Sequence, residues 1–153
     1  MISFITFVPL LAAVLILLTP SGQVRILRFI ALLGSLVSLV GVLSLLIGFD
    51  SSAGLQFVEK VAWIPGLGVN YFVAVDGVSL LVLLLTALLA PVTVIASWDR
   101  EERAKPYFFL LSVQFTALFG AFTALNFFHW FIFWEAALVP AFFLIKLFGC
   151  GAD

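Results

Sequence analysis

The sequence FFHWFIFWEAALVPAFFLIKLF, which runs from Phe127 to Phe148, decides the class of this protein. A helix needs about 20 mostly apolar residues to cross a bilayer, and this segment is long enough. It contains one carboxylate, Glu135, which lies about 12 Å along the helix from Phe127 at roughly 1.5 Å per residue. A charged side chain is costly inside hydrocarbon and usually marks a functional site, so Glu135 is the leading candidate residue.

Proton chemistry is the use that best fits a carboxylate at this position. Burial favours the neutral form of Glu135 and a nearby cation favours its charged form, so a residue between these influences can bind and release protons. Pro140 follows five residues later and has no backbone N–H, which leaves the carbonyl of Ala136 without its usual helical partner. The alternatives are a neutral Glu135 that is hydrogen-bonded between helices and a Pro140 that only kinks the helix.

Two other ionisable residues belong to the same segment. His129 lies six residues before Glu135, so the two side chains point to largely opposite sides of a helix. We expect His129 at the membrane interface, with a place in a proton path as the alternative. Lys146 falls on nearly the same face as Glu135, but about 16 Å further along the axis. We interpret Lys146 as an anchor whose ammonium reaches the headgroups, with a relay role as the alternative.

The composition is that of an integral membrane protein. Of the 153 residues, 65% are hydrophobic and 10% are charged, whereas soluble domains contain roughly 25% charged residues. The net charge of −1 excludes a basic surface for nucleic acid. The single cysteine, Cys150, excludes an internal disulfide and a cysteine-based metal cluster, and we assign it no role. The sequence contains no dinucleotide or phosphate loop, so we expect neither a cofactor nor a metal on this chain.

Five apolar segments predict an all-α bundle of membrane helices, in a single membrane domain over residues 1–153. The predicted helices are residues 2–18, 26–47, 77–97, 107–125 and 127–148. A break is required near Asn126, because residues 107–148 as one helix would be about 63 Å long, about twice the thickness of the hydrocarbon core.

The longest polar segment lies between the second and third predicted helices, over residues 48–75. It ends in Tyr71–Val75, which is apolar and aromatic enough for a short strand. Asp76 then stands where it can cap the third helix and favour its positive end, with Gly77 as the first helical residue. We therefore interpret Asp76 and Gly77 as structural rather than catalytic.

The basic residues predict how the chain is oriented. The first and third loops contain most of them, namely Arg25, Arg28, Arg100, Arg103 and Lys105, and the second loop contains only Lys60. The positive-inside rule places the first and third loops in the cytoplasm. The N-terminus is then outside and the C-terminus is cytoplasmic, and the bacterial cytoplasmic membrane is the expected location.

Three groups of residues, in order and at matching spacing, carry a family resemblance. They are Val58-Glu59-Lys60 with Trp63-Ile64-Pro65, the run Val75-Asp76-Gly77-Val78-Ser79-Leu80-Leu81, and Phe133-Trp134-Glu135 with Leu138-Val139-Pro140 and Phe143-Leu144-Ile145. Over essentially its whole length the chain resembles the N-terminal part of subunit M (chain 4) of proton-pumping NADH:quinone oxidoreductase, complex I. That subunit is a member of the antiporter-like family of membrane subunits, which includes Mrp-type cation/proton antiporters.

The resemblance implies a longer subunit that is built from two inverted repeats of membrane helices. In that family, the Glu of the fifth helix pairs with a Lys on a later helix, and Lys, His and Glu residues carry protons at mid-membrane. Glu135 matches that Glu. The resemblance also implies other membrane-arm subunits as partners. NADH, flavin, iron–sulfur clusters and quinone would be bound by partner subunits and not by this chain.

The sequence departs from the family pattern at several positions. Asn126 stands where many relatives have an acidic residue, His129 where an apolar residue is usual, and Ala141-Phe142 where a Met-Tyr type of pair occurs. The second repeat and the partner Lys are not in this sequence. We therefore expect either the N-terminal piece of a longer subunit or a split protein that needs a companion.

Taken together, these observations predict a membrane-arm subunit of NADH:quinone oxidoreductase. It would take part in proton translocation coupled to quinone reduction, without doing redox chemistry itself. The alternatives are a subunit of an Mrp-type cation/proton antiporter and a structural assembly subunit. Sodium-dependent transport without NADH dependence would favour the antiporter, and full pumping after replacement of Glu135 would favour the structural role.

Overall fold

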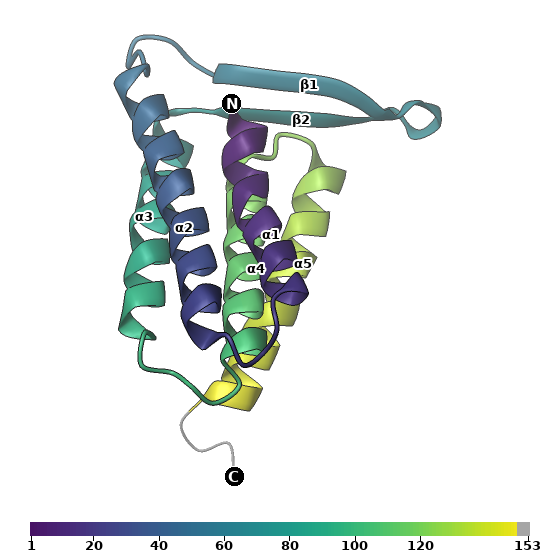
Figure 1. Cartoon of the computed structure of the whole chain (residues 1–153). Coiled ribbons are helices and arrows are strands. Elements are labelled where there is room, and N and C mark those ends of the chain that lie inside the picture. The colour runs from purple at the N-terminus through teal and green to yellow at the C-terminus, as the bar shows by residue number, and fades with distance from the viewer. Residues whose placement is uncertain (150–153) are drawn as a thin grey trace.

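The structure is a computed structural model that describes residues 1–149, so Cys150 and the expected cytoplasmic C-terminus lie outside the described residues. Within this range, five helices stand side by side and a two-stranded hairpin lies across one end (Figure 1). The helices are α1 (Ile2–Leu18), α2 (Val24–Ile47), α3 (Gly77–Ala96), α4 (Ala104–Thr123) and α5 (Phe127–Phe148). Four of the described helices are long and apolar enough to cross a membrane, and α1, with 17 residues, is shorter.

The helix ends follow from local chemistry. Asp76 is the N-cap of α3, and its side chain accepts a hydrogen bond from Ser79 N at 2.7 Å. In return, Asp76 N donates to Ser79 Oγ at 2.8 Å. This reciprocal arrangement is a capping box. Asn126 caps α5 by accepting from Phe128 N at 2.9 Å. The predicted break before α5 is therefore present, and Leu125 N donates to Phe72 O at 2.9 Å within it.

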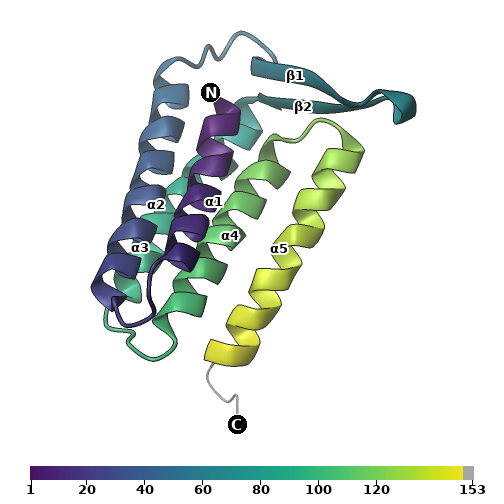
Figure 2. The same ribbon diagram turned by 45° about the vertical axis from the view of Figure 1, so that its right-hand side comes forward.

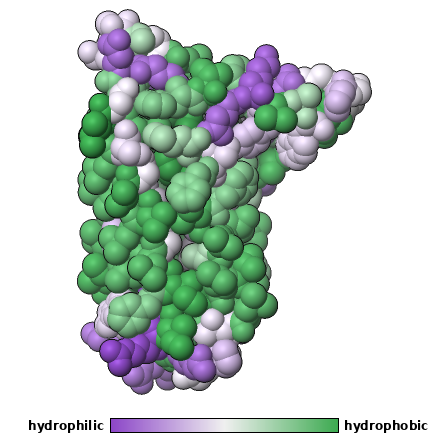
Figure 3. Space-filling model, turned by 45° about the horizontal axis from the view of Figure 1, so that its top comes forward, coloured by the Kyte–Doolittle hydropathy of each residue, from purple (hydrophilic) through white to green (hydrophobic). Residues whose placement is uncertain are grey.

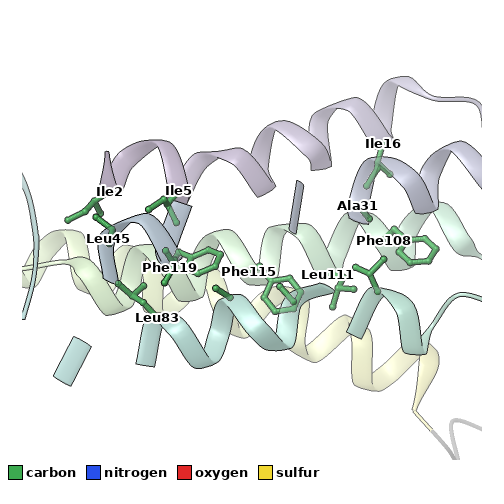
Figure 4. Close-up of a cluster of buried hydrophobic side chains, with 14 of the residues drawn as sticks. Ile2, Ile5, Ile16, Ala31, Leu45, Leu83, Phe108, Leu111, Phe115 and Phe119 are labelled. Carbon is green, nitrogen blue, oxygen red and sulfur yellow. The ribbon is translucent and has the colours of Figure 1, made fainter. Parts of the chain in front are cut away.

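Helix α4 lies at the centre of the bundle and packs against the other four helices. The core side chains of α1, α2, α3 and α4 point toward one another (Figure 4). Helices α1 and α2 approach closely because α2 has glycines at the contact. A Cβ added at Gly34 would lie 2.7 Å from Ala12 Cβ, and one at Gly41 would lie 2.6 Å from Ile5. Small residues at such steps allow close helix packing in membranes.

Only part of the hairpin was predicted from the sequence. Strand β1 (Gln56–Ile64) pairs antiparallel with β2 (Val69–Val75), and a short 3₁₀ turn, Pro65–Leu67, joins them. The all-α class holds for the bundle, but the expected short strand at Tyr71–Val75 is longer and has a partner. Strand β1 was missed because Glu59 and Lys60 interrupt its apolar residues.

Some helix boundaries also differ from the expected ones. Helix α2 begins at Val24, α3 ends at Ala96, and α4 runs from Ala104 to Thr123 rather than over residues 107–125. The early start of α4 has a physical reason. Pro106 lies in its first turn, where a backbone N–H has no helical partner, so proline is tolerated there.

The surface of the bundle is apolar between two polar ends. In the view of Figure 3, hydrophobic residues cover the middle of the molecule, and hydrophilic residues gather at the hairpin end and at the opposite end. Large hydrophobic side chains in the middle of the helices, such as Leu33, Val40 and Leu85, are exposed. An exposed apolar band of this extent suits hydrocarbon or protein neighbours rather than water.

Candidate functional site

Helix α5, which contains the leading candidate residue, lies at the side of the bundle and packs with one face against α4 (Figure 2). Only His129 and Pro140 of its residues are buried. Phe133 packs directly against Gly120 of α4, where an added Cβ would overlap the phenyl ring. This contact fixes the rotation of α5 about its axis, and it leaves a wide face of the helix uncovered by the described residues.

Glu135 belongs to that uncovered face. Its side chain is exposed and stands among exposed apolar residues, namely Phe131, Leu138, Val139 and Phe142. Among residues 1–149, no hydrogen bond or ion pair involves Glu135. The carboxylate is therefore placed where a group from outside the described bundle can reach it.

Lys146 does not meet Glu135 in this structure. Its Nζ lies 5.5 Å from the centroid of the Phe142 ring, in the last turn of α5. A cation above an aromatic face is attracted by the ring quadrupole. Pro140 is buried whereas Glu135 is exposed, so the proline and the carboxylate occupy different faces of the helix.

His129, which we expected at the membrane interface, lies at the hairpin end of α5 and is covered by the hairpin. It lies in the first turn of α5, on a different face from Glu135, and it is only 2% exposed. Its ring centroid lies 4.7 Å from that of Tyr71 on the hairpin and 4.9 Å from that of Phe133. Neither ring nitrogen has a hydrogen-bond partner among the described residues. The hairpin covers His129 in the first turn of α5, so the imidazole is shielded by Tyr71 and Phe133.

An open cavity of about 550 Å³ lies between the hairpin, α1 and α5 beside His129, and some of its lining side chains, such as Trp63, are exposed. The lining side chains are mostly apolar, and three of them are polar. They are Ser3, Phe7, Val61, Ala62, Trp63, Tyr71, His129, Ile132 and Phe133. Figure 2 shows the strands of the hairpin crossing the ends of these two helices.

A polar cluster joins the start of α1 to the hairpin beside this cavity. Ser3 Oγ lies 2.7 Å from Tyr71 Oη and donates to the carboxylate of Glu59, which also pairs with the N-terminal ammonium of Met1. Burial raises the pKa of Glu59, but the hydrogen bonds from the N-terminus and Ser3 lower it more, so its pKa lies below the usual value. No local sequence signal marks this cluster, because Ser3 lies 56 residues from Glu59 and 68 residues from Tyr71 along the chain.

The described residues contain no group of three His, Cys, Asp or Glu side chains that could hold a metal ion. Asp76 is occupied as the cap of α3, and its hydrogen bonds with Ser79 lower its pKa. Glu59 and His129 both lie near the hairpin, whereas Glu135 lies about 9 Å further along α5 than His129.

Comparison with known proteins identifies relatives of the whole chain, although no protein-family model matches it. It is 41% identical over 149 residues to F420H2 dehydrogenase subunit M of Methanosarcina mazei, an alignment that covers 96% of this chain and 30% of the relative. It is 38% identical over 154 residues to NADH-quinone oxidoreductase subunit M of Rhodobacter capsulatus, covering 97% of this chain and 30% of the relative.

The fold has a counterpart among solved structures. A chain of respiratory complex I from Thermus thermophilus with bound NADH superimposes with a TM-score of 0.79 and 25% identity, over 97% of this chain and 29% of that chain. The chain thus spans about 30% of the length of the curated relatives named above. It is homologous to subunit M, or chain 4, of NADH-quinone oxidoreductases, and it matches one part of that larger subunit.

Proposed function

We propose that this chain is part of a membrane-arm subunit of a proton-translocating complex of the NADH-quinone oxidoreductase type, and that Glu135 transfers protons in it. The names of the relatives support the complex. The position of Glu135 supports its role, because the carboxylate stands on the uncovered face of α5 at about mid-depth of the helix. This single observation carries the proposal for the chemistry.

The free-energy cost of a carboxylate at this depth indicates which kind of group lies next to Glu135. An acidic side chain at the centre of a membrane helix costs about 2.5–3.5 kcal/mol on insertion scales. A cation on a neighbouring helix offsets this cost and favours the charged form of the carboxylate. The relatives are about three times longer than this chain, so the remaining length offers helices that can present such a cation. We infer a lysine, as the family resemblance implies.

The pair would bind and release protons as its surroundings change. When the cation approaches, Glu135 gives up its proton, and when the cation withdraws, Glu135 takes one up. The carbonyl of Ala136, which Pro140 leaves free, adds a hydrogen-bond acceptor within the same turn. Redox chemistry belongs to partner subunits that bind NADH, flavin, iron–sulfur clusters and quinone. Since one relative is an F420H2 dehydrogenase subunit, the electron donor is set elsewhere in the complex.

The orientation is part of the proposal. The loops between α1 and α2 and between α3 and α4 lie at the end of the bundle away from the hairpin (Figure 1). Near these loops, Arg28 Nη2 donates to Arg100 O at 3.2 Å. The positive-inside rule then places that end in the cytoplasm and the hairpin and N-terminus outside. A bacterial cytoplasmic membrane is our inference for the location.

The test is a Glu135→Gln substitution in the whole complex, reconstituted in vesicles with its donor and quinone. Electron transfer and proton uptake are measured together. We expect assembly to be retained and proton pumping per electron to fall about tenfold or more, since one proton-transferring group typically contributes a factor of at least 10². Glu102→Gln, in the exposed loop between α3 and α4, is the matched control and should pump normally. Normal pumping by Glu135→Gln would overturn the proposal.

A further inference from the structure

His129 poses a question that the role of Glu135 does not answer. Its imidazole is 2% exposed, and both ring nitrogens lack a partner among residues 1–149. A buried polar group without a hydrogen bond is destabilising, and native proteins rarely leave one unpaired. The adjacent cavity of about 550 Å³ is large enough for several water molecules. Ser3 and Tyr71 also line it, so water there would find more than one polar partner.

The hydrogen bonds beside the cavity have a fixed direction. An ionised carboxylate only accepts hydrogen bonds, so Ser3 Oγ donates its single hydrogen to Glu59. Ser3 Oγ must then accept from Tyr71 Oη, which lies 2.7 Å away. Because the hydroxyl of Tyr71 donates to Ser3, its oxygen is left to accept a hydrogen bond from the cavity. Each donor from the cavity outward therefore points toward Glu59.

We propose that the cavity beneath the hairpin holds water, and that His129 exchanges protons through this water, Tyr71, Ser3 and Glu59 with the aqueous phase on the hairpin side. The proposal rests on the proposed function in proton translocation. It adds a proton path at the hairpin end of α5, which is separate from the role proposed for Glu135. The side chain of Glu59 is 25% exposed, so the path reaches solvent at its outer end.

The proton balance is simple. A protonated imidazole gives an N–H proton to a cavity water, the water gives a proton to Tyr71 Oη, and the tyrosine hydroxyl proton passes to Ser3 Oγ. The hydroxyl proton of Ser3 then passes to the Glu59 carboxylate, which releases it to solvent. One proton leaves His129 and one enters the aqueous phase, and the two hydroxyl groups rotate to restore the starting directions.

The charged groups around His129 are compatible with this path. On α1 the nearest is the N-terminal ammonium, which pairs with Glu59. On the hairpin, Lys60 lies over the Phe72 ring at 5.1 Å rather than on the cavity lining. On α5, Glu135 is about 9 Å further along the axis and on another face. The described residues therefore place no cation of the hairpin against the imidazole.

Hydration is tested first, without any enzymatic readout. The whole complex is labelled with ¹⁵N-histidine, and the ring signals of His129 are assigned as those lost in His129→Gln. Water-edited solid-state NMR in lipid bilayers then measures whether water magnetisation reaches these nitrogens. We expect transfer to the His129 ring. Transfer from lipid acyl chains alone, or none at all, would overturn the proposal.

The relay is tested by measuring proton release in vesicles that contain the whole complex. NADH is tried first as the electron donor, and reduced F420 is tried second. Tyr71→Phe removes the hydroxyl, and Ser3→Ala is the second variant in case the first does not assemble. Proton release to the hairpin side per electron should fall about tenfold in both. The controls are Tyr107→Phe and Ser97→Ala, a pair with the same contact at 2.6 Å at the other end of the bundle. These controls should release protons as the unmodified complex does.

The outcomes separate this inference from the proposed function. If Tyr71→Phe and Ser3→Ala release protons as fast as their controls, the relay is overturned, whatever Glu135→Gln does. If Glu135→Gln pumps normally, the proposed role of Glu135 fails, while the NMR result still decides the cavity. A hydrated His129 with slowed release in both cavity variants supports the relay.

Discussion

The contact between Gly120 and Phe133 gives the sharpest structural prediction, because it sets how α5 presents Glu135. An alanine at Gly120 would place its Cβ inside the van der Waals radius of the Phe133 ring. Alanine is favoured over glycine in a helix interior by about 1 kcal/mol, so propensity alone predicts a more stable protein. Overpacking a tight contact costs about 1–3 kcal/mol, and occasionally more. We expect the second effect to win, because the added Cβ overlaps several atoms of the Phe133 ring. An overpacking cost at the upper end of its range leaves a net loss of up to about 2 kcal/mol.

The assay is SDS-induced unfolding of the full-length subunit in mixed micelles, followed by circular dichroism. Gly66→Ala is the control, because nothing lies within 4 Å of a Cβ at Gly66, and it should change the free energy of unfolding by less than about 0.5 kcal/mol. Combining Gly120→Ala with Phe133→Leu should relieve the overlap, which a double-mutant cycle detects as a favourable coupling energy. A Gly120→Ala variant that is more stable by about 1 kcal/mol would show that propensity alone governs the site and would refute the packing argument.

Two further predictions concern the hairpin end. Asp76→Ala removes the capping box of α3 and should lower the free energy of unfolding by about 1 kcal/mol. In the same assay Asp76→Asn should lose less, and equal losses would contradict the capping role. The pKa of Glu59 is lower in the folded protein than its ordinary value of 4.5, so its contribution to stability is complete above pH 4.5 and is lost as the pH falls through the lower folded pKa. Unfolding measured against pH should show this loss, Glu59→Gln should abolish it, and an unchanged profile in that variant would contradict the ion-pair cluster.

Much of the bundle was predictable because the bilayer imposes simple length and polarity limits. The break before α5 follows from length alone, and Asn126, which caps the helix, stands at it. Asp76 before an apolar run was enough to predict the start of α3. The start of α4 was placed too late because Pro106 was treated as a boundary, although a first turn accepts proline.

Neither the cavity nor the polar cluster at the hairpin could be predicted from the sequence. Ser3, Glu59 and Tyr71 meet only because β1 pairs with β2 above the start of α1. Nothing local in residues 56–64 marks that pairing, since strand propensity depends strongly on context. The burial of His129 was likewise not predictable, because the hairpin that covers it is set by tertiary pairing. By contrast, Glu135 could be singled out from the sequence because a lone acid in an apolar helix is conspicuous, and its role stays a prediction.

The most direct test of the central claim is whether Glu135 changes its protonation state during turnover. Redox-induced infrared difference spectroscopy on the reconstituted complex detects the C=O stretch of protonated carboxyl groups. We predict a carboxyl band that appears or disappears when quinone is reduced, shifts in D2O, and is absent in Glu135→Gln but present in Glu102→Gln. An identical difference spectrum in Glu135→Gln and in the unmodified complex would contradict the claim that this carboxylate carries protons.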